Sequence, residues 1–309
     1  MNDDTAQDGQ SHDPVLGNIS QRGRIWLTRV GMLVGLLLLI AAILVIWERR
    51  ELIGDALEAV RHPAPLDVAI LLGCVAINIM LSGVVFHLLM LRYGKVGFFE
   101  MQALIASATL FNYLPLRPGL LGRIAYHKAV NNIAVVDSAK TVFQAMLCSL
   151  LVAGWLGVAL GISRWLDISI WIGVILPMPI LLGSGLFSTW RLWLWALGAR
   201  YIDLMVWAVR YWVAFKLIGV DIAPATALAC ACIGMFTMLI PFFSNGLGLR
   251  EWAIGLTVPL FDDQIVLMEI GMTADLVNRA AEVMGVLALG LVGIGLLLLS
   301  RKLHTKEKP

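Results

Sequence analysis

Charged residues are scarce in this chain of 309 residues. Only 14% of them are Asp, Glu, Lys or Arg, and 60% are hydrophobic, whereas soluble domains are typically about 25% charged. Such a composition excludes an ordinary soluble domain, which needs a polar surface around its core. The chain also contains repeated apolar runs of about 18 residues or more, the length that indicates transmembrane helices. The sequence therefore predicts a polytopic membrane protein.

Several chemical signatures are absent as well. The sequence has no Gly-x-x-x-x-Gly-Lys-Ser/Thr loop for a nucleotide, no paired nucleophile and base, and no loop long enough for a soluble catalytic domain. Its five histidines show no metal-ligand spacing. Its four cysteines lie in apolar segments, which favours buried thiols over a disulfide framework. With a net charge of only +2 and no single basic patch, we expect no enzyme activity, cofactor, metal or nucleic-acid partner.

The hydrophobic runs predict an all-α architecture of six full spans and two broken, re-entrant helix hairpins. The expected full spans are residues 27–47, 66–91, 138–162, 168–188, 199–219 and 265–300. The expected hairpins, each interrupted at a proline, are residues 98–133 and 223–260. Residues 1–26 and 301–309 are expected to be tails, the first one disordered, and residues 48–65 a charged loop.

Basic residues at both ends of the hydrophobic region orient the chain. Three arginines precede or begin the first span, and Arg301 and Lys302 follow the last. The positive-inside rule then places both termini in the cytoplasm, in agreement with an even number of spans. The loop 48–65 opposes this orientation with arginines of its own.

A short motif occurs twice, each time where an apolar segment is broken. The first copy runs from Leu114 to Arg123 as LPLRPGLLGR, and the second from Ile240 to Glu251 as IPFFSNGLGLRE. Both contain a proline near the start and then Gly-x-x-x-Arg. Related breaks in two halves of a chain are typical of a transporter's binding site. The copies predict an inverted repeat of three plus three spans, residues 27–162 and 168–300; the alternative is two independent loops that share common turn residues.

Three stretches carry a resemblance to a known family: Asn112 to Pro115, Gly119 to Arg123, and Pro241 to Glu251. Together they resemble the lysylphosphatidylglycerol synthase transmembrane-domain family, also called flippase-like membrane proteins, over about residues 27–300. The resemblance implies translocation of anionic or charged lipids in a bacterial-type cytoplasmic membrane, often beside a lipid-modifying enzyme. In the two-domain synthases of the family an aminoacyl-transfer domain follows the membrane part, and we expect the membrane unit alone here.

The chain also departs from the family pattern. Leu120 stands where an acidic residue usually follows the glycine, and Gln144 lies in a region where the family usually carries charged residues. Arg279 fits the equivalent place in the second half.

Candidate ligand-binding residues lie at and after the two breaks. Arg123 and Arg250 each follow a glycine turn at the expected start of a returning half-helix, where free N–H groups and partial positive charge attract phosphate. The arginine fork matches phosphate bidentately. We therefore expect both arginines to line one polar cavity, and we expect Glu251 to hold an arginine or contact an ammonium group. The candidate substrate-binding residues are Asn112, Arg117, Gly119, Arg123, Gly246, Gly248, Arg250 and Glu251. The alternative is a purely structural or interfacial role for the arginines.

Further charges lie inside the expected spans. Arg210 lies near the middle of span 199–219, and an arginine at the bilayer centre costs about 2.5–3.5 kcal/mol on insertion scales. Asp203, Glu251 and Asp275 are its candidate partners, as a structural ion pair or a gating charge. The candidate gating or coupling residues are Asp203, Arg210, Asp275, Arg279 and Glu282.

Three function classes fit these patterns. The first is a lipid flippase or lipid transporter whose ligand is a membrane lipid, with a phosphate headgroup. The second is an accessory membrane subunit of a cell-envelope lipid-modifying enzyme. The third is an intramembrane enzyme that acts on a lipid-linked phosphate or sugar.

Overall fold

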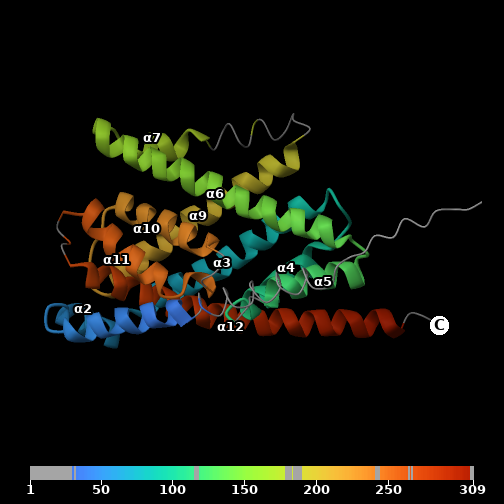
Figure 1. Cartoon of the computed structure of the whole chain (residues 1–309), viewed down its shortest axis with the longest axis horizontal. Coiled ribbons are helices and arrows are strands. Elements are labelled where there is room, and N and C mark those ends of the chain that lie inside the picture. The colour runs from blue at the N-terminus through green and yellow to red at the C-terminus, as the bar shows by residue number, and fades with distance from the viewer. Residues whose placement is uncertain are drawn as a thin grey trace, which may run out of the picture.

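The structure is a computed structural model that describes residue 30 and residues 33–114, 118–177, 183, 190–240, 244–263, 265 and 267–306. Within these residues the chain is helical and forms no strand (Figure 1). The all-α fold class is therefore confirmed. Arg117 and the first proline of each motif copy, Pro115 and Pro241, lie outside the described residues.

The described helices follow the hydrophobic runs of the sequence closely. In chain order they are Leu33–Glu48, α2 (Gly54–Arg61), α3 (Pro65–Met90), α4 (Phe98–Phe111), α5 (Pro118–Val130), α6 (Val135–Leu166), α7 (Ile170–Ile175), α9 (Arg191–Leu217), α10 (Pro224–Leu239), the 3₁₀ turn η1 (Ser244–Gly246), α11 (Leu249–Phe261) and α12 (Met268–Lys306). Pro65 and Pro224 each occupy the first helical position, where a missing N–H costs nothing.

Four of the described helices are long and apolar enough to cross a membrane: α3, α6, α9 and residues Met268–Leu299 of α12. Three shorter apolar helices are Leu33–Glu48, α4 and α10. The chain thus has the helices of an integral membrane protein. Much of the expected span 168–188 lies outside the described residues.

The long helices pack around a central pair, α3 and α9. Both helices of this pair contact α6 and α12, which Figure 1 shows on opposite sides of the body. Helix α4 packs against α3 and α12, whereas α10 packs against α9 and α6. Exchanging α3 with α9, α4 with α10 and α6 with α12 therefore leaves this set of contacts unchanged.

The segment 48–65 differs from the expected loop because it contains the short helix α2. Ile53 and Ala56 are buried in the main hydrophobic core, whereas Glu51, Asp55 and Glu58 are exposed. The charged side chains made the segment resemble a loop in the sequence. These two core-facing residues, one just before the helix and one inside it, are enough to dock its roughly two turns against the bundle.

Both expected helix breaks are present. Helix α4 ends at Phe111 before α5 begins at Pro118, and α10 ends at Leu239 before α11 begins at Leu249. Ile240 is extended, as the residue before a proline prefers. The second break then turns through left-handed conformations at Asn245, Gly246 and Gly248, whose φ values are 52°, 68° and 77°.

Glycine has a packing role at both breaks. A Cβ atom at Gly119 would lie 1.9 Å from the carbonyl oxygen of Ala108, so only glycine lets α5 start this close to α4. A Cβ atom at Gly248 would lie 2.1 Å from the carbonyl oxygen of Gly35, where the helix Leu33–Glu48 crosses. These glycines shape the breaks, and their candidate role in ligand binding stays a prediction.

Candidate functional site

The two helix breaks meet at one carboxylate on α12. Tyr113, just after α4, donates its hydroxyl hydrogen to Glu282 Oε1 over 2.6 Å. Asn245, in η1, donates from Nδ2 to the same oxygen over 2.9 Å. The two breaks therefore approach each other, as the repeated motif predicts.

The other oxygen of this carboxylate binds two arginines. Arg210 Nη2 and Arg250 Nη1 each lie 3.0 Å from Glu282 Oε2. Arg250 also pairs through Nε with Asp275 at 3.0 Å, and Asp275 accepts a hydrogen bond of 2.8 Å from Tyr211. Because Arg250 is 0% exposed, its guanidinium group is a buried centre of the ion network.

The partner of Arg210 differs from the three that the sequence suggested. Arg210 pairs with Glu282, and Asn78 and Asn278 accept further hydrogen bonds from its guanidinium group at 3.2 and 3.0 Å. Asp203 lies two turns away on the same helix, about 10 Å along the axis, which is too far for direct pairing. It binds Arg200 at 2.6 Å instead.

Asn78 connects these two ion pairs. Its Nδ2 donates to Asp203 Oδ1 over 2.7 Å while its Oδ1 accepts from Arg210. A continuous buried chain of polar contacts therefore runs from Arg200 through α3 to Glu282.

Glu251 holds an arginine, as expected. Arg279 Nε lies 2.5 Å from Glu251 Oε1, and Arg279 Nη2 donates to the carbonyl oxygen of Gly246 at 3.4 Å. This pair ties the second break to α12, because Gly246 and Glu251 flank the turn and Arg279 is on the long helix. Contact of Glu251 with an ammonium group stays a prediction.

Charge is balanced in this network, which we call the Glu282 network. It joins four buried arginines and four buried carboxylates: Arg200, Arg210, Arg250 and Arg279 with Asp203, Glu251, Asp275 and Glu282. Buried charges of this kind are tolerated only when they are paired and hydrogen-bonded. Among the described residues the four positive and four negative charges therefore balance, although Arg200 Nε and Arg250 Nη2 are buried without a hydrogen-bond partner.

Arg123 has a different environment. It is 7% exposed, and its guanidinium carbon lies 3.8 Å from the ring centroid of Phe86 on α3. Within the described residues no carboxylate pairs with it. The structure thus does not bring Arg123 and Arg250 into one cavity: Arg250 is enclosed in the Glu282 network, whereas Arg123 faces a cavity of its own.

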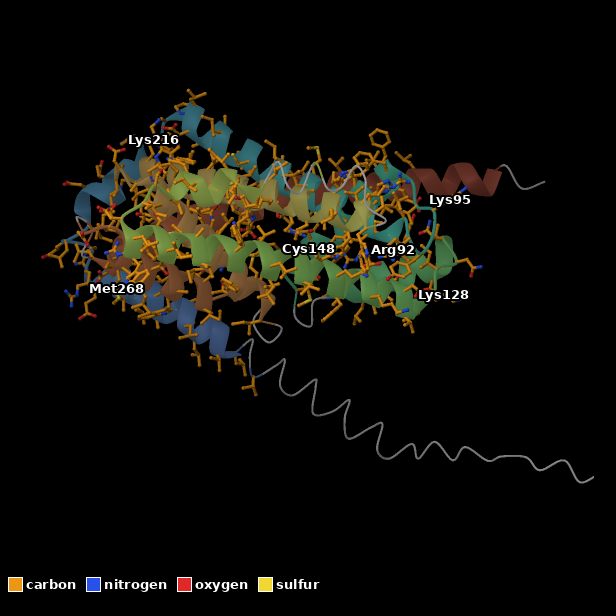
Figure 2. The ribbon with its side chains drawn as sticks, turned by 90° about the horizontal axis from the view of Figure 1, so that it is seen from above. Arg92, Lys95, Lys128, Cys148, Lys216 and Met268 are labelled. Atoms are coloured by element: carbon orange, nitrogen blue, oxygen red, sulfur yellow. The ribbon has the colours of Figure 1, made fainter. Side chains whose placement is uncertain are left out.

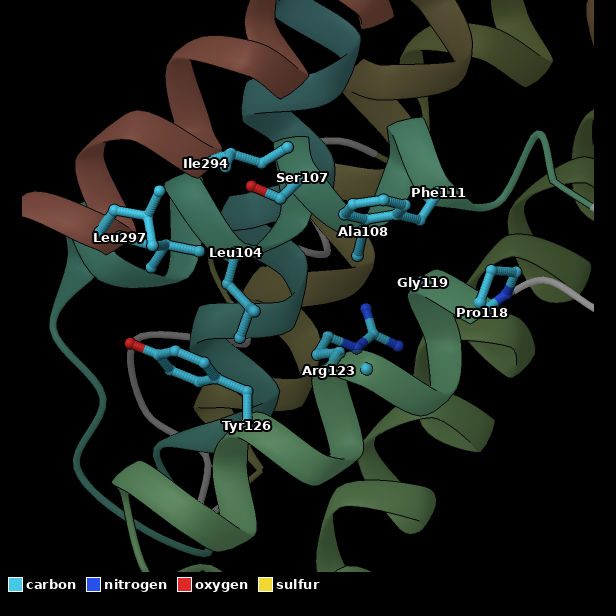
Figure 3. Close-up of a pocket in the computed structure, with 12 residues that line it drawn as sticks. Leu104, Ser107, Ala108, Phe111, Pro118, Gly119, Arg123, Tyr126, Ile294 and Leu297 are labelled. Atoms are coloured by element: carbon cyan, nitrogen blue, oxygen red, sulfur yellow. The ribbon is translucent and has the colours of Figure 1, made fainter. Parts of the chain in front are cut away.

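That cavity has a volume of about 240 Å³ and lies between α4, α5 and α12 (Figure 3). Its lining residues are Leu104, Ser107, Ala108, Phe111, Pro118, Gly119, Gly122, Arg123, Tyr126, Ile294, Leu297 and Leu298. Phe111 and Leu298 are 42% and 56% exposed, so the cavity reaches the outer surface of the bundle. Its walls are apolar apart from Ser107, Arg123 and the Tyr126 hydroxyl, and we call it the Arg123 cavity.

Asn112 has a structural task at this site. Its Oδ1 accepts a hydrogen bond of 3.0 Å from the backbone N–H of Leu120. One of the free N–H groups at the start of α5 is therefore already used, and Gly119 is pressed against the backbone of α4. The N-terminus of α5 thus has one N–H fewer for an anion, and Arg123 is the arginine that the described residues place at this break.

Sequence analysis missed the two residues that bring the breaks together. Tyr113 and Asn245 lie beside or inside the motif copies, yet neither carries a charge that draws attention. Their position in the sequence could have identified them, because both are hydrogen-bond donors next to a helix break, where a side chain can reach a neighbouring helix.

Comparison of the chain with protein-family models, with curated proteins and with solved structures finds no match. The fold and the site are still those of a helical integral membrane protein. The chain has four helices able to span a membrane, and two interrupted helix pairs that meet on a buried ion network.

Proposed function

We propose that this protein is a lipid flippase or lipid transporter that moves an anionic or charged lipid across a bacterial-type cytoplasmic membrane. The observation that carries the proposal is the meeting of both helix breaks on Glu282. Non-helical backbone at membrane depth is tolerated where it is buried in protein or lines a cavity. Discontinuous helices at a repeat interface are the usual site of transporters.

The packing of the long helices supports an inverted repeat as part of this proposal. The contacts of α3, α4 and α6 have counterparts in those of α9, α10 and α12. Such a correspondence is expected when two halves with the same element order cross the membrane in opposite directions. In the proposed architecture, Leu33–Glu48 and the segment 168–188 complete the six spans.

The distribution of basic residues supports the proposed orientation. Figure 2 shows Arg92, Lys95 and Lys128 at one end of the long axis, with Lys216 at the other. The C-terminal end of α12 lies at the same end as Lys95. By the positive-inside rule this end faces the cytoplasm.

The Glu282 network suggests how the breaks are coupled. Each break contributes one hydrogen bond to the same carboxylate oxygen, so neither can move away without changing the environment of the other. Opening would also separate buried charges, which is costly unless water or a ligand group replaces the lost partner. Glu282 would thus hold the two halves in a closed arrangement between transport steps.

The test is headgroup translocation by the purified full chain in liposomes. A fluorescent phosphatidylglycerol, labelled on its headgroup, is bleached from outside, and the protected fraction is followed with time. We expect wild-type protein to expose the inner-leaflet label, and Glu282→Gln to slow this at least about tenfold. The matched control is Glu269→Gln, which is the same change on the same helix at a carboxylate whose one ion-pair partner among the described residues is the exposed Arg49 at 4.0 Å.

A wild-type rate equal to that of protein-free liposomes would reject transport by the chain alone. Equal rates for wild type and a well-folded Glu282→Gln variant would reject the coupling role of the network. Thermal unfolding of the same preparations separates a lost function from a lost fold.

A further inference from the structure

The Arg123 cavity contains a positive charge that no carboxylate of the described residues neutralises. Arg123 is nearly buried, and within the described residues it has no ion-pair partner. All four arginines of the Glu282 network, by contrast, have carboxylates. A buried charge needs a compensating partner, and an anion bound in the cavity would supply it.

The guanidinium group is oriented for such an anion. The guanidinium carbon lies over the Phe86 ring, 3.8 Å from its centroid, and this cation–π contact restrains the group. Figure 3 shows the nitrogen atoms pointing into the space bounded by Ala108, Phe111 and Gly119. The N–H edges are therefore available for a planar, bidentate contact with two oxygens of one anion.

Few other donors surround this position. Ser107 donates its hydroxyl hydrogen to the carbonyl oxygen of Ala103 at 2.7 Å, and Tyr126 donates to Glu100 at 3.0 Å. Asn112 already accepts the Leu120 N–H. Arg123 is thus the only cation among the described residues that line the cavity, which suits a single negative charge better than a doubly charged phosphate.

The rest of the cavity suits an acyl chain. Leu104 and Phe111 form the α4 wall, and Ile294, Leu297 and Leu298 form the α12 wall. The exposed edges at Phe111 and Leu298 give access from the apolar outer surface of the bundle. A small hydrophilic anion would leave these walls uncovered, whereas an amphiphile would cover them and place its head at Arg123.

We propose that the Arg123 cavity binds one lipid whose head carries a singly charged oxyanion, a phosphodiester or a carboxylate, with an acyl chain against α12. The inference rests on the proposed function and names the substrate class of the transporter. The repeated motif suggested the same role for both arginines. The inference instead assigns lipid binding to Arg123 and stabilisation of the fold to Arg250.

The test is lipid binding by the purified full chain in detergent, measured by native mass spectrometry. The probes are phosphatidylglycerol, oleate, phosphatidylcholine and inorganic phosphate. We expect one tight site for phosphatidylglycerol or oleate, and weaker binding of phosphatidylcholine, whose choline neutralises its own phosphate. Comparing phosphatidylglycerol with oleate identifies the oxyanion. Binding of free phosphate as tight as that of either lipid would overturn the role of the acyl chain.

Three variants locate the site. Arg123→Ala should weaken binding about ten- to a hundredfold, the loss expected for a charge-assisted hydrogen bond. Arg123→Lys should recover part of this loss, because lysine keeps the charge but lacks the planar fork. Lys128→Ala is the matched control, since it removes a cation from an exposed position on the same helix. Unchanged binding in folded Arg123→Ala would overturn the proposal.

Gly122→Leu tests the cavity without removing a charge. A Cβ atom at Gly122 meets nothing within 4 Å, so the larger side chain can enter the cavity without a clash at its base. We expect a folded protein that binds lipid at least about tenfold more weakly, because the leucine occupies part of the lipid volume. If Arg123→Ala does not fold, this variant decides, and wild-type affinity in folded Gly122→Leu would overturn the proposal.

Transport measured on the same preparations distinguishes this inference from the proposed function. Specific binding that is lost in Arg123→Ala, together with no translocation by wild type, would leave the lipid site standing and reject transport. Translocation by wild type and Arg123→Ala at equal rates, with equal lipid binding, would support the function and reject the site.

Discussion

The two helix breaks carry the same motif but place its arginine in opposite environments. Arg250, after the second break, contacts Asp275 and Glu282 and is completely buried. Arg123, after the first, faces an aromatic ring and a cavity. The difference shows that a repeated motif specifies the backbone geometry of a break, whereas the neighbouring helix decides what its arginine does.

Helix α12 accounts for this difference. Its N-terminal half carries Asp275, Arg279 and Glu282 and packs beside α11. Its C-terminal half, which contributes Ile294, Leu297 and Leu298 to the Arg123 cavity, is apolar there. One half of the long helix thus supplies counterions to the second break, and the other supplies a hydrophobic wall to the first.

The largest expected effect is a loss of stability when Arg250, but not Arg123, is replaced by alanine. Arg250→Ala leaves Asp275 without its arginine and takes one of two arginines from Glu282, and breaking a buried pair typically costs about 3–5 kcal/mol. Arg123→Ala strands no carboxylate and loses only the contact with Phe86, so the free energy of unfolding should change by about 1 kcal/mol or less. Thermal unfolding in detergent, without added lipid, measures both.

Equal destabilisation by the two substitutions would contradict the division of roles. A further contrast uses lipid: addition of phosphatidylglycerol should raise the unfolding temperature of wild type and not that of Arg123→Ala, because a ligand that binds only the folded state stabilises it.

The next largest expected effect is a difference in unfolding temperature between substitutions at two glycines of α5. Gly119→Ala places a Cβ atom 1.9 Å from the carbonyl oxygen of Ala108, a backbone atom that cannot rotate away. Overpacking of this kind costs about 1–3 kcal/mol. Gly122→Ala meets open space, and alanine favours a helix by up to about 1 kcal/mol over glycine. Opposite shifts in unfolding temperature are therefore expected, and a neutral Gly119→Ala would contradict the tight contact between α4 and α5.

Much of the helical pattern is predictable from the sequence because its signals are local. The expected span 66–91 corresponds to α3 at Pro65–Met90, and both breaks fall where a proline follows an apolar run. Hydropathy and proline geometry act within a few residues, so a single sequence contains them. The sequence did not predict the helix α2 because its apolar side has only a few residues.

The ion pairs were less predictable because they depend on tertiary contacts. Arg210 and Glu282 are 72 positions apart, and the sequence offers several acidic residues as partners. Proximity along one helix favoured Asp203, which in the structure binds Arg200. The sequence identified Arg210, Asp275 and Glu282 as interior charges but missed Arg200, and the packing of α3, α9 and α12 determines which of these residues form ion pairs.

The smallest expected effect is a coupling energy, which tests whether the two breaks act together. Tyr113→Phe and Asn245→Ala each remove one donor to Glu282 Oε1, at a cost of about 1.5–3 kcal/mol for a hydrogen bond to a charged group. Because one donor remains after either change, the double variant should lose more stability than the sum of the two single losses, with a coupling of about 0.5 kcal/mol or more.

Tyr126→Phe, which removes a hydroxyl from the distant Glu100 contact at 3.0 Å, is the control partner and should combine additively with Asn245→Ala. Additive losses for Tyr113→Phe and Asn245→Ala in chemical or thermal unfolding would mean that each break is held independently, and Glu282 would then be two separate contacts rather than the point that joins the halves.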